Sequence, residues 1–330
     1  MKLGKRHFLV GSTSWCLATA LPRAWAQARP AFPSKPLRIV VPNAAGGAAD
    51  ITARTIAQQI SGPLGQSVIV ENKPSAGGIV AGEMVARAEP DGHTMLLVSS
   101  GTAVSAALFK SLPFDTVKDF APVSQLATFD LAIVVAEGGR FKTLNELLAF
   151  GRANPGKLNL GTPQIGTTQN LSAELFKSAS GIDFQIVPFN GTPPVITAIR
   201  GGQLDAGIDI LGPLMPQITS RSLRALAVMG AQRAAQLPDV PAVAESGPPL
   251  ANFNVSSWNG LAVPARTPPE AIARLNREIQ AALAQAEVQK RLLELNLVAK
   301  GGTPQQLEER LASDIRRWSD VIARAKIPKQ

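Results

Sequence analysis

From residue 37 onward, this 330-residue chain alternates short apolar runs with segments of helical periodicity, and this alternation restricts the possible folds most strongly. Apolar runs at residues 37–41, 67–72 and 93–99 predict three strands. Between them, apolar residues recur at helical spacing, as with Ile56 and Ile60. A strand–helix–strand–helix–strand series folds into a parallel sheet with right-handed crossovers. The sequence therefore predicts an α/β protein.

A second series of predicted strands and helices lies between two long extended runs, at residues 123–137 and 253–264. This order predicts one lobe inserted into another, with two crossing strands that form a hinge near residues 126–132 and 253–260. Small ligands usually bind in the cleft between such lobes. The predicted boundaries are residues 27–127 and 256–330 for lobe 1, and residues 128–255 for lobe 2.

Two amphipathic helices are predicted near the C-terminus. Thr267 with Glu270, and Thr303 with Gln306, have the spacing of capping boxes with proline at the first helical position. We expect the apolar face of each helix to pack on the core.

Residues 1–26 have the features of a secretory signal peptide. A basic start is followed by an apolar run at residues 8–21, and Ala24 and Ala26 fit an A-x-A cleavage site. We therefore expect export to the periplasm and cleavage near Ala26, by the general or the twin-arginine route. A membrane anchor is the alternative interpretation of this segment. Cys16, the only cysteine, lies within it.

After residue 26 the chain holds few of the side chains that enzymes use. It has one histidine, His93, no cysteine and no tyrosine, and no G-x-S-x-G motif. Metal-ligand spacings and nucleotide-binding fingerprints are also missing, and lysine and arginine are scattered instead of clustered. We expect no catalytic residues, no metal, no cofactor, no nucleic-acid partner and a monomeric chain. An exported hydrolase built around His93 is an alternative.

Small polar loops follow several of the predicted strands. The loop at residues 43–49 leads into a helix predicted from about Asp50, and a helix N-terminus with free N–H groups suits an anion. Parallel strands place such loops together at the carboxyl edge of a sheet. The candidate ligand-binding residues in these loops are Asn43, Gly46, Gly47, Ala48, Ala49, Ser99, Ser100, Thr102, Gly166, Thr167, Thr168 and Asn190.

Several stretches resemble the periplasmic solute receptors of tripartite tricarboxylate transporters, the Bug-type receptors. The resemblance covers nearly the whole chain after the signal peptide and implies a two-lobed type II periplasmic-binding-protein fold. It also implies capture of a small carboxylate and delivery to membrane partners, one large and one small integral subunit. A receptor that presents its ligand to a sensor kinase is an alternative. The matching stretches are residues 33–97, 174–191, 201–209, 223–228, 233–247 and 257–270.

The resemblance adds Asp209 to the candidate site, in the role of orienting water or meeting an amino group of the ligand. The chain departs from the family pattern around the expected cleft. Asn43-Ala44-Ala45 replaces an aromatic residue and prolines, Asn170 replaces a histidine, and Phe189-Asn190 replaces Tyr-Lys. Which di- or tricarboxylate, amino acid or aromatic acid binds is left open.

Overall fold

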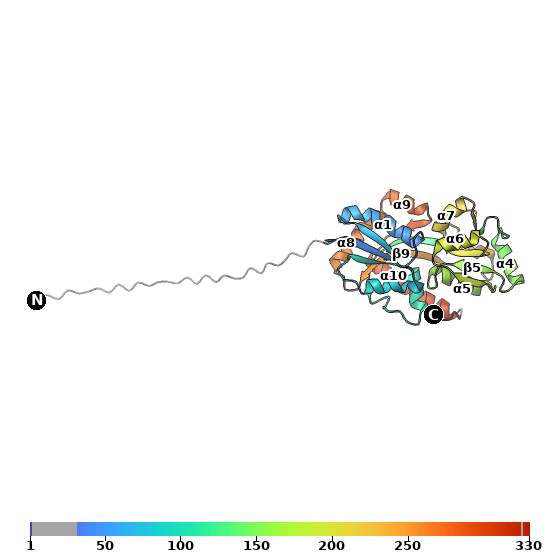
Figure 1. Ribbon diagram of the computed structural model, residues 1–330, viewed down its shortest axis with the longest axis horizontal. Helices are drawn as coiled ribbons and strands as arrows, with labels where there is room; N and C mark the ends of the chain where they lie inside the picture. The colour runs from blue at the N-terminus through green and yellow to red at the C-terminus, as the bar shows by residue number, and fades with distance from the viewer. Residues whose placement is uncertain (2–31, 325) are drawn as a thin grey trace. The chain divides into compact units, whose positions relative to one another are not determined.

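The computed structural model describes Met1 and residues 32–324 and 326–330, and residues 32–330 form one compact unit. The predicted signal peptide lies outside the described residues, apart from Met1. Figure 1 shows α4, α5 and α6 gathered around β5, apart from α1 and α8. No described helix has the length and apolarity needed to cross a bilayer.

The first series of strands forms the parallel part of one half of the sheet, as predicted. Strand β1 pairs in parallel with both β2 and β3. The apolar residues of β1 are completely buried, which explains its unbroken apolar sequence. This half contains β1 (Leu37–Val41), α1 (Ala48–Leu64), β2 (Val68–Asn72), η1 (Ala76–Gly78), α2 (Ile79–Ala86), β3 (Thr94–Ser99) and α3 (Ser100–Leu108).

The second series forms another parallel set, in which β5 lies between β6 and β7. Helix α4 begins after Thr143, whose hydroxyl accepts a hydrogen bond from the Glu146 N–H. The elements are α4 (Leu144–Ala153), β5 (Asn159–Thr162), α5 (Thr168–Ser180), β6 (Gln185–Pro188), α6 (Thr192–Arg200), β7 (Ala206–Ile210), α7 (Leu211–Thr219), β8 (Leu223–Val228) and η2 (Val243–Ser246).

Strand β4 (Phe120–Ala136) joins the two halves. Its residues 120–130 pair with β9 (Ser256–Pro264), and its residues 131–136 pair with β7 and β8. The main strand order is β2-β1-β3-β9-β4-β7-β5-β6, with β8 and β10 also paired to β4. The two predicted extended runs thus lie side by side where the halves meet, and the architecture is a two-lobed α/β fold. The lobe boundaries given above stay a prediction.

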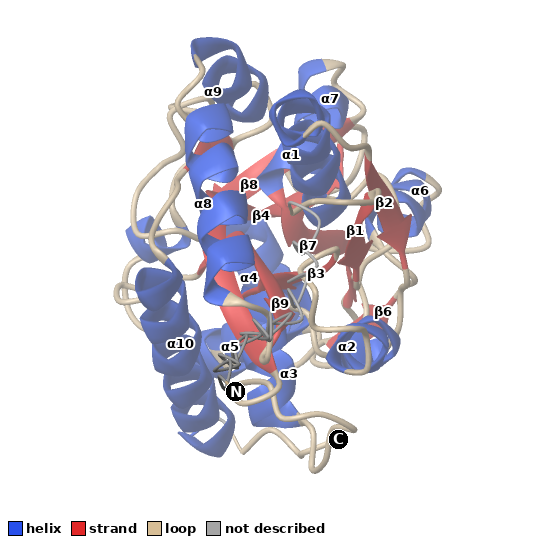
Figure 2. Ribbon diagram, turned by 90° about the vertical axis from the view of Figure 1, so that its left-hand side faces the viewer, coloured by secondary structure: helices blue, strands red, loops and turns tan. Residues whose placement is uncertain are grey.

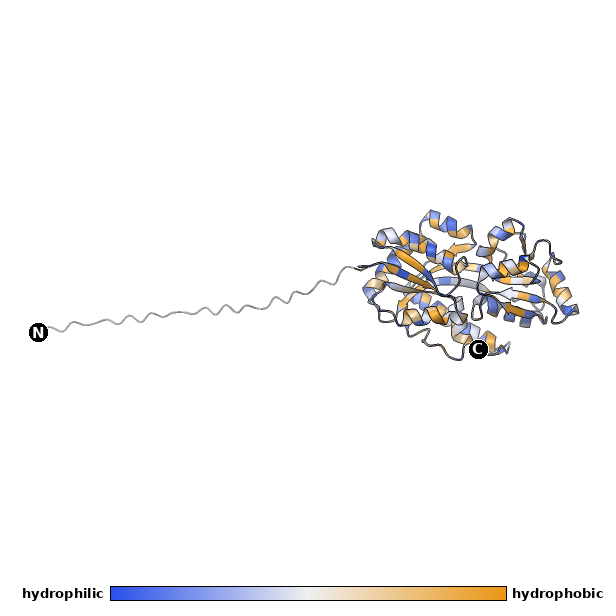
Figure 3. Cartoon of the chain, in the orientation of Figure 1, coloured by the Kyte–Doolittle hydropathy of each residue, from blue (hydrophilic) through white to orange (hydrophobic). Residues whose placement is uncertain are grey.

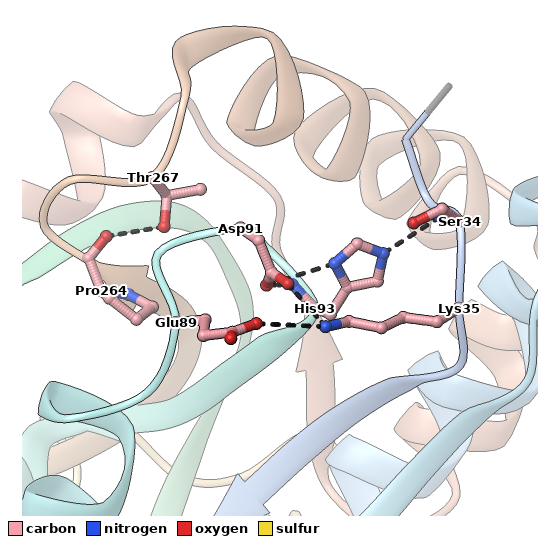
Figure 4. Close-up of polar contacts among 7 residues, drawn as sticks. All are labelled: Ser34, Lys35, Glu89, Asp91, His93, Pro264 and Thr267. Carbon is pink, nitrogen blue, oxygen red and sulfur yellow. Dashed lines mark hydrogen bonds and ion pairs between the residues drawn. The ribbon is translucent and has the colours of Figure 1, made fainter. Parts of the chain in front are cut away.

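Three helices follow β9 where two were predicted: α8 (Pro269–Leu283), α9 (Ala286–Leu293) and α10 (Pro304–Arg324), with β10 (Leu297–Ala299) between the last two. The cap at Thr303 is confirmed, because Thr303 and Gln306 exchange side-chain hydrogen bonds with each other's backbone N–H. The cap at Thr267 is wrong. Pro268 occupies the N-cap of α8, and the buried Thr267 hydroxyl donates to the Pro264 carbonyl instead (Figure 4).

The core lies between the strands and the helices that cover them. Figure 2 shows α8 and α10 lying along the strands at one end of the unit. Hydrophobic residues concentrate in the strands and alternate with hydrophilic ones along the helices (Figure 3). Trp258 of β9 is fully buried, and its indole N–H donates to Asp314 of α10 at 2.6 Å, which fixes α10 on the sheet.

Candidate ligand-binding cleft

A cleft lies where the loops of the two halves face each other. Its volume, measured as the space open to the centre of a water molecule, is about 70 Å³. A single water needs roughly 10–15 Å³ on the same measure, so the cleft can hold a small molecule. Its wall combines apolar side chains with backbone and hydroxyl groups from both halves. The polar and glycine lining includes Asn43, Gly47, Ser75, Gly77, Ser99, Thr102, Gln164, Gly166, Thr167, Thr168, Gln169, Thr192, Ser257 and Asn259, and the apolar lining includes Ala48, Ala49, Leu97, Phe114, Phe129 and Ile210.

Helix α1 points its N-terminus into this cleft. Gly47 occupies its N-cap and supplies no side-chain cap, so the first N–H groups of the helix have no side-chain acceptor there. Asp50 sits in the first turn but binds elsewhere: one oxygen accepts the Gly46 N–H at 3.0 Å, and the other accepts Arg54 Nε at 2.9 Å. Burial disfavours its charge, yet Arg54 and the Gly46 N–H keep the pKa of Asp50 below its usual value.

The second lobe contributes the N-terminus of α5. Thr167 caps this helix by accepting the Asn170 N–H at 3.2 Å. Gln169, in the first turn of α5, lines the cleft, and its Nε2 donates to Asp209 Oδ1 at 3.0 Å. Asp209 is completely buried, and burial raises its pKa to about 6 against the opposing hydrogen bonds of Gln169 and the Ile210 N–H.

Direct hydrogen bonds connect the two lobes at one side of the cleft. The Gly77 N–H donates to the Ile165 carbonyl at 3.0 Å, and the Ser105 hydroxyl donates to the Gly166 carbonyl at 2.9 Å. The Ser100 hydroxyl also bonds to Thr168 Oγ1 at 2.6 Å. These contacts close the cleft at this side, so the structure corresponds to a closed arrangement of the lobes.

The structure brings most of the sequence-predicted residues into one place. The predicted residues that line the cleft are Asn43, Gly47, Ala48, Ala49, Ser99, Thr102, Gly166, Thr167 and Thr168.

Four predicted residues lie just outside the lining. The N–H of Gly46 is occupied by Asp50, which removes it from the predicted set of anion donors. Ser100 is buried between Thr168 and Ser257, to both of which it hydrogen-bonds.

The other two of the four lie on the second lobe. Asn190 is exposed and accepts a hydrogen bond from Gln164, and Asp209 lies behind Gln169.

Sequence reasoning missed two glutamines and one threonine of the second lobe. Gln164, Gln169 and Thr192 line the cleft although they belong to no recognisable motif. The two glutamines carry no local signal of a binding site, because glutamine is usually solvent-exposed.

The chemistry of the cleft is neutral. None of the described residues that line it carries a charge, so an anion held there depends on backbone N–H groups and helix N-termini. In the described part of the chain, no group of three or more His, Cys, Asp or Glu side chains could hold a metal ion.

His93 lies outside the cleft lining. Its Nε2 accepts the backbone N–H of Ser34 at 3.1 Å, and Asp91 Oδ1 lies 3.2 Å from its Nδ1 (Figure 4). Its ring packs edge-on against Phe32. The Ser34 hydroxyl makes no hydrogen bond to this imidazole among the described contacts. This arrangement is that of a buried structural histidine.

The two-lobed fold and the closed cleft between the lobes define a solute-binding protein. Residues 52–327 match the tripartite tricarboxylate transporter family receptor, and the chain belongs to that family. BugT from Bordetella pertussis is 32% identical over 88% of this chain and 89% of its own length.

Three solved structures have the same fold. The periplasmic binding protein BugD is 30% identical with a TM-score of 0.86, over 91% of this chain and 100% of that one. MatC from Rhodopseudomonas palustris with bound malate is 32% identical with a TM-score of 0.83, over 88% and 100%. An R. palustris protein with adipate is 29% identical with a TM-score of 0.86, over 90% and 99%.

Proposed function

We propose that this chain is a periplasmic receptor that captures a small carboxylate in the interlobe cleft and delivers it to a tripartite tricarboxylate transporter. The membrane partners are the large and the small integral subunits of that transporter. The observation that carries the proposal is the uncapped N-terminus of α1 at a neutral cleft, where an anion gains hydrogen bonds without competing charges. The malate and adipate bound to two related structures support the same class of ligand.

The receptor works without catalysis in this proposal. Among the described residues, the cleft lining holds no histidine, cysteine or carboxylate that could act as a nucleophile or a general base, and His93 lies apart from it. Binding and closure are the only chemistry that these residues need to perform.

A thermal-shift screen of small acids tests the proposal. A ligand at one hundred times its dissociation constant adds about 2.7 kcal/mol to stability, which moves the melting temperature measurably. We expect at least one carboxylate to shift the melting temperature, and the methyl ester of the same acid to fail. Equal shifts by acid and ester would contradict recognition of the carboxylate.

Export is tested on the protein recovered from the periplasm. We expect its mass to correspond to a chain that begins at Gln27, after cleavage behind Ala26. An intact Met1 in that fraction would contradict the signal peptide.

A further inference from the structure

Gln169 is fixed in one orientation at the second-lobe wall of the cleft. It is only 7% exposed, and its Nε2 donates to Asp209 Oδ1 at 3.0 Å. The same Oδ1 accepts the Ile210 N–H at 2.7 Å, so it is an acceptor whether or not Asp209 carries a proton on its other oxygen. The amide NH₂ of Gln169 must therefore face Asp209. Its Oε1 is left for another partner.

No hydrogen bond reaches that Oε1 atom among the described residues, although Gln169 lines the cleft. The side-chain amide of Gln164 is oriented in a similar way, with its NH₂ group bonded and its oxygen without a partner among the described residues. Its Nε2 donates to Asn190 Oδ1 at 3.0 Å, while its Oε1 is buried without a partner in the described structure. The Gln169 oxygen thus has unused acceptor capacity at the cleft, whereas the Gln164 oxygen is a buried unsatisfied acceptor, which costs about 1–3 kcal/mol.

Asp209 adds charge behind this wall. It is completely buried, and its Oδ2 has no hydrogen-bond partner among the described residues. Three residues that flank it, Gln169, Thr192 and Ile210, line the cleft. In the part of the lining that the structure describes, no residue carries a positive charge that could offset an anion brought close to Asp209.

From these contacts we propose that the ligand has one ionised carboxylate, at the N-terminus of α1, and an uncharged hydrogen-bond donor at the end that faces Gln169. The donor is an O–H or N–H group that satisfies the free Oε1 of Gln169. A second ionised carboxylate at this end would meet the amide oxygen of Gln169 and, behind it, the buried carboxylate of Asp209. This inference rests on the proposed function and names the substrate class of the same cleft.

Sets of acids that differ only at the far end provide the test. One set is hexanoate, ω-hydroxyhexanoate and adipate, a second is butyrate, γ-hydroxybutyrate and succinate, and a third is para-toluate, para-(hydroxymethyl)benzoate and terephthalate. Dissociation constants are measured by titration calorimetry. In every set that binds, we expect the hydroxy acid to bind about tenfold or more tighter than the alkyl acid and the diacid.

Two variants separate the contributions. Gln169→Leu removes the acceptor, so the preference for the hydroxy acid over the alkyl acid should fall to about twofold or less. Asp209→Asn keeps an oxygen for the Gln169 amide but removes the charge, so the diacid should gain about tenfold while the hydroxy acid changes little. Gln58→Leu, at an exposed position of α1, is the control and should leave the preferences of the wild type.

The outcomes are distinguishable. A diacid or alkyl acid that binds as tightly as its hydroxy acid, or an unchanged preference in Gln169→Leu, would overturn this inference and leave the carboxylate receptor intact. Binding of none of the acids would contradict the proposed function, and the inference would fall with it.

Discussion

Gly77 and Gly166 meet backbone to backbone across the cleft. A Cβ atom on Gly166 would lie 2.8 Å from Gly77 Cα and 2.9 Å from the Phe109 ring. The Gly77 N–H donates to the carbonyl of Ile165, the residue before Gly166. Glycine is therefore needed at position 166, since a side chain there would keep the lobes from reaching this closed arrangement.

Gly166→Ala is expected to hinder closure and weaken ligand binding. Gly166 has φ +83°, so alanine there also strains the backbone, and a control must carry the same strain. Gly181→Ala provides it, because Gly181 has φ +68° and a Cβ there meets nothing within 4 Å.

Small-angle scattering with and without ligand checks this prediction. We expect the wild type and Gly181→Ala to become more compact when ligand binds, because the lobes close on it. Gly166→Ala should stay near the unliganded radius and bind at least about tenfold more weakly, as lost closing contacts of roughly 1–2 kcal/mol would imply. Identical scattering curves for empty and liganded wild type would contradict a hinged receptor.

The fold was predictable because its signals are local. Strands β1 and β3 are apolar runs, and the capping pair of Thr303 and Gln306 lies within four residues. Helix α3 was missed because its start, Ser99-Ser100-Gly101, has the composition of a turn. Ser99 in fact caps the helix, accepting the Gly101 N–H and donating its own N–H to the hydroxyl of Thr102.

The site was predictable only in part because its polarity depends on contacts between distant segments. The loop at Gly47 could be expected from a strand, glycines and a helix in succession. The role of Gln169, in α5, depends on Asp209, which follows it by 40 positions and lies on β7. No local pattern encodes which amide atom faces the cleft.

Gly47→Val is expected to abolish the thermal shift that the best-binding acid produces. Gly47 has φ −87°, so valine does not strain the backbone, but its methyl groups would fill the space in front of the α1 N–H groups. Gly62→Val is the control on the same helix, since a Cβ there meets nothing within 4 Å. A wild-type shift in Gly47→Val would place the carboxylate elsewhere.

Asp209→Asn is expected to change how stability depends on pH. Burial raises the pKa of Asp209 from 3.8 to about 6, so in this range the folded state holds a proton that the unfolded state has released. Its contribution to the free energy of unfolding is therefore complete below pH 3.8 and declines as pH rises to about 6, by about 3 kcal/mol in all.

Denaturant unfolding of both proteins across this pH range measures the effect. The difference in free energy of unfolding between wild type and Asp209→Asn should shift in favour of the variant as pH rises, because asparagine does not ionise. A difference that stays constant with pH would mean that Asp209 ionises at its ordinary pKa.

His93→Ala is expected to lower stability and leave ligand affinity unchanged. The variant leaves the Ser34 N–H without its acceptor and removes the ring that packs on Phe32, a loss of about 1–3 kcal/mol. Ser34→Ala should have little effect, because the bond to His93 comes from the Ser34 backbone. If the wild type hydrolyses an ester, and both His93→Ala and Ser34→Ala lose this activity, the result would support the alternative of a hydrolase built around His93.

The most direct test of the receptor account is the fate of its ligand. Protein incubated with the acid that gives the largest thermal shift is analysed by native mass spectrometry, and the small molecule is then recovered after denaturation. The account predicts one acid per chain, recovered chemically unchanged however long the incubation lasts. Conversion of the acid to a product in the presence of the wild type, or a chain that binds no carboxylate, would contradict it.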